Sequence, residues 1–182
     1  MINVLNEFNV KNIYITTDWH LNHKNIVLYD NRPENFKDII ASNFKIIEDD
    51  DLLINLGDVI FNNRHELHDF NKGIKGKKIL IMGNHDRNTP TWYSQQGFDK
   101  VLQKLVFNQI VFSHKPVELS NYQGCKFNIH GHFHEYKEGL NTQYTFYDKR
   151  NMCLTISEME YKPILLKDFL EKRNIKLNWL YE

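Results

Sequence analysis

Five short hydrophobic runs in this chain each end in side chains that commonly bind metal ions. The five blocks are Asp18-Trp19-His20, Gly57-Asp58, Gly83-Asn84-His85-Asp86, His114, and His130-Gly131-His132-Phe133-His134. Their donor atoms are carboxylate and amide oxygens and imidazole nitrogens. This donor set contains no thiolate and suits Mn, Fe, Ni or Zn rather than a structural Cys-rich zinc site. Together the blocks predict a cage for two divalent metal ions.

The first two blocks offer carboxylates. Asp18 and His20 are separated by one residue, and side chains two apart on an extended segment point the same way, so both could reach one ion. Asp58 follows Gly57, where the backbone can turn sharply, and we expect its two oxygens to bridge the two ions. Taken alone, a helix-capping Asp beside an unrelated His, or a simple Gly-Asp turn, explains these residues as well.

The third block combines a ligand with predicted catalytic residues. Asn84 offers a neutral oxygen ligand, and His85 beside it can face the substrate without binding metal. Asp86 either orients His85 or caps the following turn. We therefore predict His85 and Asp86 as catalytic residues, while a plain polar turn is the alternative.

Histidines make up the last two blocks. His114 alone is a weak signal, because a single His after a hydrophobic strand is more often structural. His130, His132 and His134 alternate, so on a strand extension their rings would point to one side. Two of the three suffice for the site, and we expect His130 to support the ligands from behind.

Two ions held about 3.5–4 Å apart can hold a hydroxide between them and clamp the oxygens of a phosphoryl group. Metal binding lowers the pKa of water, so hydroxide is available near neutral pH. The chemistry predicted from these residues is in-line attack of a metal-bridging hydroxide on phosphorus.

These blocks need a scaffold of strands and helices. Short β-prone runs precede each block, and a sixth run, residues 151–157, carries no such residue at its end. Between the runs, hydrophobic spacing predicts helices over residues 36–47, 67–76, 91–96 and 163–172, the third capped by Thr89-Pro90. Residues 135–149 form a long stretch without an assignment. Strands that alternate with helices predict a layered α/β domain.

The composition limits the function classes. With 182 residues, the chain fits a single domain over residues 1–182. Its formal net charge is zero, which gives no broad attraction to nucleic acid or to an anionic membrane. No hydrophobic run is long enough to span a membrane, and the first ten residues lack a signal peptide pattern. We expect a cytoplasmic protein in which Cys125 and Cys153 are reduced thiols.

The order of the five blocks resembles the calcineurin-like metallophosphoesterase superfamily, whose pattern is Asp-x-His, Gly-Asp, Gly-Asn-His-Asp/Glu, His, Gly-His-x-His. The resemblance implies a four-layered α/β/β/α sandwich with the metals at strand ends. It implies that one metal is held by Asp18, His20, Asp58 and His134, and the other by Asp58, Asn84, His114 and His132. It also implies that His85 contacts the substrate phosphate and protonates the leaving group.

Residues 18–26, 31–33 and 151–163 further resemble a small bacterial and phage branch of that superfamily. This resemblance makes His23 and Arg32 candidates for the substrate rim, beside Asn84 and His85, although a solvated loop explains them equally. The Asp-Arg-Gly signature of protein phosphatases is missing after Gly57-Asp58.

A small phosphodiester or phosphomonoester, such as a nucleotide or cyclic nucleotide, is therefore the predicted substrate, with Mn the expected metal in vitro. An extended nucleic acid is a weaker candidate, because the chain has no net positive charge. The alternatives are a nuclease and a non-catalytic protein-interaction module on the same fold. The oligomeric state is open.

Overall fold

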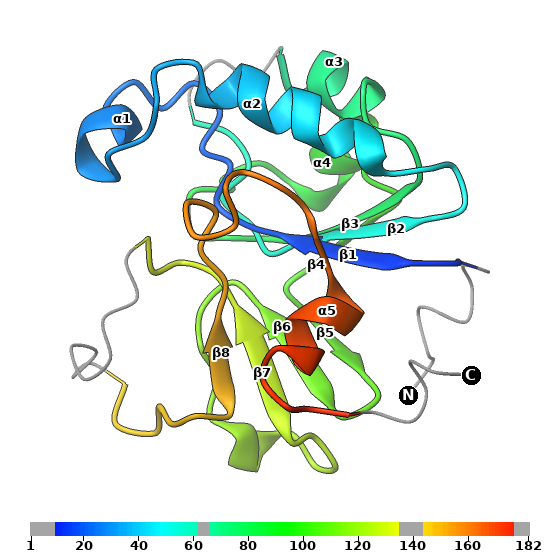
Figure 1. Ribbon diagram of the computed structural model, residues 1–182, viewed down its shortest axis with the longest axis vertical. Helices are drawn as coiled ribbons and strands as arrows, with labels where there is room; N and C mark the ends of the chain where they lie inside the picture. Colours follow the sequence, from blue (N-terminus) through cyan, green and yellow to red (C-terminus); the bar gives the residue numbers. More distant parts are fainter. Residues whose placement is uncertain (1–9, 62–65, 135–143, 177–182) are drawn as a thin grey trace.

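The computed structural model describes residues 10–61, 66–134 and 144–176, and the structural statements below concern these residues. Two sheets and five α-helices form the described fold (Figure 1). The strands are β1 (Ile13–Thr16), β2 (Leu52–Asn55), β3 (Lys77–Ile81), β4 (Lys100–Leu102), β5 (Lys104–Phe107), β6 (Ile110–Ser113), β7 (Phe127–His130), β8 (Asn151–Cys153) and β9 (Ile164–Leu165). The helices are α1 (Ile26–Tyr29), α2 (Phe36–Asn43), α3 (Glu66–Lys72), α4 (Pro90–Gln95) and α5 (Leu166–Glu171), with 3₁₀ turns η2 (Phe44–Ile46) and η3 (Leu119–Asn121).

The first sheet has the strand order β4-β3-β2-β1-β9. Strands β1 to β4 run parallel, while β9 is antiparallel to β1. The carboxyl ends of β1, β2 and β3 therefore share one edge of the sheet, which is where open α/β sheets place their ligands. The loops carrying the first three predicted blocks follow these strand ends.

The second sheet has the order β5-β6-β7-β8, with β6, β7 and β8 parallel and β5 antiparallel to β6. In the β6–β7 pair, Ser113 stands opposite His130. The last two predicted blocks therefore leave this sheet at neighbouring strand ends.

One hydrophobic core joins the two sheets. It contains Ile15 and Ile54 of the first sheet together with Phe112 and Ile129 of the second, all with no solvent exposure. Every residue of β2 and of β6 is buried, as is typical of parallel strands that are covered on both faces. In Figure 1, helices α2, α3 and α4 lie above the first sheet and the second sheet lies below it. The predicted single-domain α/β sandwich is confirmed, with two sheets and flanking helices.

Three predicted helices are present, and the fourth needs a correction. The α4 cap forms as predicted, because Thr89 Oγ1 accepts a bond of 3.2 Å from the Trp92 backbone N–H. The helix predicted over residues 163–172 instead begins with β9, since Leu165 pairs with Tyr14 of β1 before α5 starts. The short strands β4 and β5 were not predicted. Most of the unassigned stretch, residues 135–143, lies outside the described residues.

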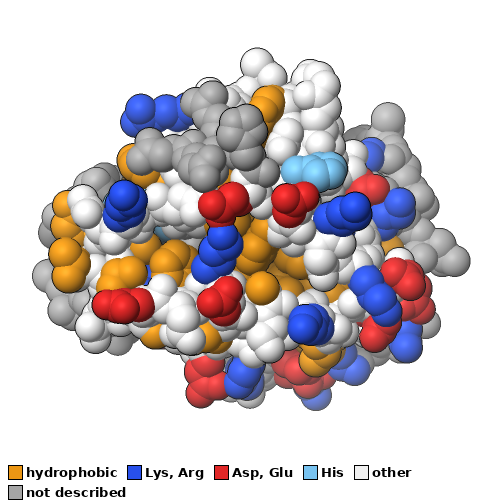
Figure 2. Space-filling model, turned by 90° about the horizontal axis from the view of Figure 1, so that it is seen from above, with side chains coloured by type: hydrophobic (Ala, Val, Ile, Leu, Met, Phe, Trp, Pro, Cys, Tyr) orange, Lys and Arg blue, Asp and Glu red, His pale blue; other side chains and the backbone are white. Residues whose placement is uncertain are grey.

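The surface agrees with the balanced composition. On the face shown in Figure 2, acidic and basic side chains lie beside one another. None of the helices in the described part of the chain has the length and apolar character that a membrane span requires. Cys125 and Cys153 are both free thiols, as predicted.

Candidate metal centre

Six of the predicted ligands gather into two groups. We call Asp18, His20 and His134 the first cluster, and Asp58, His114 and His132 the second cluster. Within each cluster one donor atom of every residue lies within 4.8 Å of the others. Each cluster combines carboxylate oxygen with imidazole nitrogen and draws on both sheets. This donor chemistry fits a divalent cation.

Asp58 connects the two clusters. Its Oδ2 lies 3.3 Å from His114 Nε2 and 3.8 Å from His20 Nε2. Asn84 joins the second cluster, because its Oδ1 lies 3.0 Å from His114 Nε2. The carboxylate of Asp58 therefore lies between the two clusters.

The backbone brings these ligands together by a route that differs from the predicted one. Asp18, His20, Asp58 and His132 have φ angles of +48°, +48°, +54° and +73°, a region that residues other than glycine rarely adopt. The extended segment predicted for Asp18 and His20, and the regular strand extension predicted around His132, are therefore wrong. Left-handed backbone at candidate ligands is typical of functional sites that the surrounding structure holds in place.

Hydrogen bonds between the loops hold this strained backbone. The N–H groups of Asp18 and His20 donate to the carbonyls of Gly57 and Asp58, at 2.9 Å each. The loop after β1 is thereby fastened along the loop after β2. Asp18 and His20, which are separated by one residue, can therefore reach one ion without lying on an extended strand.

Glycines allow the carboxylates to pack directly on backbone. A Cβ at Gly83 would lie 2.1 Å from Asp58 Oδ1, and a Cβ at Gly131 would lie 2.5 Å from Asp18 Oδ2. Any larger residue at either position would displace a candidate ligand.

The first cluster contains buried polar atoms that lack partners. Asp18 Oδ2 accepts bonds from Thr17 Oγ1 at 2.6 Å and from the His132 N–H at 3.0 Å. By contrast, Asp18 Oδ1 and both ring nitrogens of His20 are buried without a hydrogen-bond partner among the described residues. Leaving such atoms unsatisfied is costly, so these atoms fit a bound cation. Burial opposes ionisation of Asp18, but the surrounding histidines outweigh it and hold the pKa of Asp18 below its usual range.

Asp30 and Arg32 support the first cluster from behind. His134 Nδ1 lies 3.3 Å from Asp30 Oδ2, which leaves Nε2 free to face a cation. Burial lowers the pKa of His134, but the bond to Asp30 more than offsets this and raises it. Arg32 is buried, and donates from Nε to Asp30 at 2.6 Å and from Nη1 to the Trp19 carbonyl at 3.0 Å.

The predicted place of Arg32 on the substrate rim is therefore wrong. Its guanidinium is directed inward because it neutralises Asp30, a residue that the spacing of the blocks did not indicate.

The second cluster is internally bonded. His114 Nδ1 donates to the Leu56 carbonyl at 2.9 Å, which aims Nε2 at Asp58 and Asn84. Burial opposes the charged form of His114, but the bond to Asp58 outweighs it and raises the pKa to about 9. Burial, with the nearby charges of His114 and Lys115, lowers the pKa of His132 to about 4. The carboxylates of this centre thus attract positive charge, and a divalent cation would compete with the proton on His114.

His85 and Asp86 occupy different places. His85 has a side chain that is 34% exposed, with Nε2 4.0 Å from Asp58 Oδ2, and burial lowers its pKa. Both oxygens of Asp86 accept backbone N–H bonds, from Asp58 and Gly83 at 2.8 Å and from Val59 at 3.1 Å. Asp86 therefore fastens the loop after β3 to the loop after β2.

His23 and Phe61 lie beside His85. The His23 ring lies 5.6 Å from the His20 ring and 4.3 Å from the Phe61 ring, and the Phe61 ring lies 5.6 Å from His85. Phe61 escaped the sequence analysis, because a hydrophobic residue three positions after Asp58 looks like ordinary core.

His130 lies behind the ligand loop. It is fully buried, donates from Nδ1 to the Gly131 carbonyl at 2.8 Å, and has Nε2 3.2 Å from the Tyr147 hydroxyl. Burial lowers its pKa to about 4. Its ring thus supports the backbone between the two clusters and belongs to neither of them.

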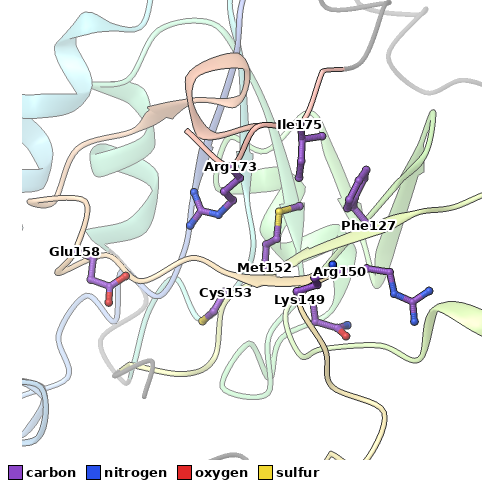
Figure 3. Close-up of a pocket in the computed structure, with 9 residues that line it drawn as sticks. Phe127, Lys149, Arg150, Met152, Cys153, Glu158, Arg173 and Ile175 are labelled. Carbon is purple, nitrogen blue, oxygen red and sulfur yellow. The ribbon is translucent and has the colours of Figure 1, made fainter. Parts of the chain in front are cut away.

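Two of the cavities that border the described residues differ in how they relate to the site. One, of 350 Å³, includes Asn84 and His114 of the metal centre in its lining. The other, of 510 Å³, is lined by β8 and the segment after α5, where Figure 3 shows Met152, Arg173 and Ile175. This second cavity shares no lining residue with either cluster.

Comparison with known proteins shows which family this chain resembles. The family model of calcineurin-like phosphoesterases matches residues 11–179. The uncharacterized protein MJ1445 of Methanocaldococcus jannaschii is 27% identical over 168 residues, which cover 86% of this chain and 88% of that protein.

Solved structures are also similar. A protein of unknown function from Aquifex aeolicus, AQ665, superimposes with a TM-score of 0.71 at 26% identity, covering 88% of this chain and 98% of its own. The nuclease MPE of Pseudomonas putida reaches a TM-score of 0.49 at 19% identity, over 67% of this chain and 61% of its own; that similarity is too low to bear on the substrate. Because the family model spans well over half of its length, this chain belongs to the calcineurin-like phosphoesterase family, and its Asp and His clusters support a metal-dependent phosphoester hydrolase.

Proposed function

We propose that this protein is a dinuclear metal-dependent phosphoesterase that hydrolyses a small, nucleotide-like phosphodiester or phosphomonoester. One observation carries the proposal: two donor clusters lie side by side with the Asp58 carboxylate between them. The first cluster would hold one ion and the second cluster, with Asn84, the other. Mn²⁺ is the ion that we would add first.

When bound, the two cations supply Lewis acidity, which makes hydroxide available near neutral pH and favours in-line attack on phosphorus. The chain contributes the geometry. The hydrogen bonds that Asp86 accepts from the backbone N–H groups of Asp58 and Gly83 keep the loops after β2 and β3 together. The His85 N–H donates to Asp58 Oδ1 at 2.8 Å, which fixes the backbone of His85 relative to the shared carboxylate.

His85 is the proposed contact to the phosphate and the proton donor to the leaving group. It is partly exposed and close to Asp58, yet it belongs to neither cluster. Burial lowers its pKa, while the negative charge of Asp58 opposes this effect. A bound phosphate adds negative charge and favours the protonated ring further. Protonation of an alkoxide leaving group gives a slight preference for diesters.

The rings of His23 and Phe61 support a nucleotide-like substrate. They lie against each other next to His85, and aromatic faces of this kind stack on nucleobases. We therefore assign His23 to the substrate rim together with Phe61.

Hydrolysis of chromogenic esters tests the proposal. The purified protein is first stripped of metal and then titrated with Mn²⁺, while release of p-nitrophenolate is followed from bis-p-nitrophenyl phosphate and from p-nitrophenyl phosphate. We expect turnover that appears with metal, saturates near two ions per chain, and favours the diester. Metal bound stoichiometrically without turnover of either ester would refute the enzymatic function and favour a non-catalytic binding module.

A further inference from the structure

A groove with two lysines opens beside the second cluster. Besides Asn84 and His114, the 350 Å³ cavity there is lined by Gln103, Lys104 and Lys115. Among the described residues that line it there is no Asp or Glu. In a chain whose net charge is zero, this lining is locally cationic.

Sheet register places Lys104 next to the strand end that carries His114. Lys104 begins β5 and pairs with Ser113 of β6, the residue directly before His114. Its Nζ lies 5.6 Å from the centre of the Tyr122 ring, a cation–π contact. This contact holds Lys104 over the second sheet, next to the end of β6 that His114 follows.

Lys115 lies next to the second cluster because it directly follows the candidate metal ligand His114 in the chain. Ser113 Oγ donates to the Lys115 carbonyl at 2.6 Å, which closes a tight turn around the ligand. Gln103 adds an amide on the same side, where its Nε2 lies 3.5 Å from Met82 Sδ. Lys104 and Lys115 are both exposed residues that line the groove.

We propose that this groove, formed by Gln103, Lys104 and Lys115, binds a second phosphate group of the substrate, next to the phosphate that is hydrolysed. The inference rests on the proposed function and narrows it to substrates that carry at least two phosphates. Lysine binds phosphate as a point charge, without the planar geometry that carboxylates and arginine share. Asn84 and His114 line the same groove, so a phosphate bound by the lysines would lie beside the second cluster.

A matched pair of substrates tests the groove. Thymidine 5′-(p-nitrophenyl phosphate) and its 3′-phosphorylated form release the same chromophore and differ by one phosphate. We expect the wild-type protein to favour the 3′-phosphorylated compound in kcat/KM, mainly through KM. Lys104→Ala and Lys115→Ala should each reduce that preference about fivefold, the most that an exposed ion pair usually contributes.

Controls separate this proposal from the function on which it rests. Bis-p-nitrophenyl phosphate, which has no second phosphate, measures any general effect of each lysine on the metal centre, and the preference of each variant is compared after that effect is divided out. Lys45→Ala and Lys126→Ala, which remove exposed lysines away from the groove, should leave the preference intact. A third substrate, with its 3′-phosphate esterified by another thymidine, shows whether the groove takes a terminal phosphate only or also a continuing strand.

The outcomes are distinct. Turnover of bis-p-nitrophenyl phosphate with equal kcat/KM for the matched pair, or a preference that survives both lysine substitutions, overturns the groove and leaves the phosphoesterase standing. Absence of turnover of every ester overturns the proposed function instead.

Discussion

The two donor clusters have similar residues but differ in how their buried polar atoms are bonded. In the first cluster, Asp18 Oδ1 and both nitrogens of His20 are buried without partners among the described residues. In the second cluster, His114 Nε2 lies within 3.3 Å of both Asp58 and Asn84, and the pKa of His114 is raised to about 9. The first cluster therefore contains buried atoms without hydrogen-bond partners in the described part of the chain, whereas the atoms of the second cluster are bonded to one another.

This difference indicates how metal binding divides between the clusters. A cation in the first cluster satisfies atoms that otherwise remain unsatisfied, whereas a cation in the second must displace the proton on His114. We therefore expect two unequal binding steps, with the first cluster the tighter. The second cluster also borders the lysine groove, so the ion expected to bind more weakly would lie on the side proposed to select the substrate.

Substitution of Asp58, the shared ligand, should have the largest effect, because both clusters use its charge. Asp58→Asn keeps the shape of the side chain but removes the charge that both clusters use, so pairing of the metals and activity should be lost together. We expect a loss in kcat/KM of more than about 100-fold, beyond the 10- to 100-fold typical of outer partners of a ligand. Metal analysis and diester hydrolysis measure both effects, with exposed Asp38→Asn as the control. Two tightly bound ions in the Asp58 variant would contradict a bridging role.

His85 offers a test that leaves both clusters intact. His85→Ala should lower kcat on the order of 10²–10⁴-fold, the usual contribution of a positioned proton donor, while metal content stays at the wild-type level. His68→Ala, at an exposed histidine whose Nδ1 lies 3.2 Å from the Gln95 carbonyl, is the matched control. If the metals are lost from the His85 variant, the residue is a ligand and its assignment is wrong.

Asp30 should affect the first cluster alone. Asp30→Asn weakens the bond that orients His134 and leaves Arg32 without its counter-charge, so affinity for the tighter ion should fall roughly 10- to 100-fold. Calorimetric titration with Mn²⁺ resolves the two steps.

A control for Asp30 exists elsewhere in the chain. Asp148 and Arg150 form a pair with the same spacing, but their side chains are 41% and 55% exposed. Asp148→Asn should therefore leave both affinities unchanged. An equal weakening of both steps by Asp30→Asn would show that the two clusters are not separable.

The pH dependence of binding gives the most specific contrast. Below a pKa of about 9, His114 carries a proton that must leave before Nε2 can bind a cation. Affinity for the weaker ion should therefore rise with pH, by about tenfold per unit for one released proton, and level off near pH 9. Titrations in buffers of different ionisation enthalpy count the protons released. A flat affinity between about pH 7 and 9 would contradict the protonated state of His114.

The sequence by itself was sufficient for the donor set and the scaffold that carries it. Hydrophobic runs of four or five residues are short enough to be strands, and a polar block directly after each run must lie at a strand end. Since parallel strands end at one edge, Asp18, Asp58 and Asn84 could be expected to meet. The cap of α4 was equally local, because Thr89 and Pro90 are adjacent in the chain.

Only the tertiary structure decided how these side chains are aimed and what surrounds them. Left-handed backbone at Asp18, His20, Asp58 and His132 depends on bonds between loops that are distant in sequence. The same holds for Arg32, whose inward direction results from its pairing with Asp30.

The lysine groove also required the fold, because the pairing of β5 with β6 brings Lys104 next to Ser113 and into a cavity that it lines together with His114. Residue type and spacing thus specified which atoms could bind a metal. Charge neutralisation and hydrogen bonding in the folded chain decided which of them face it, because those terms depend on distances that spacing along the chain does not set.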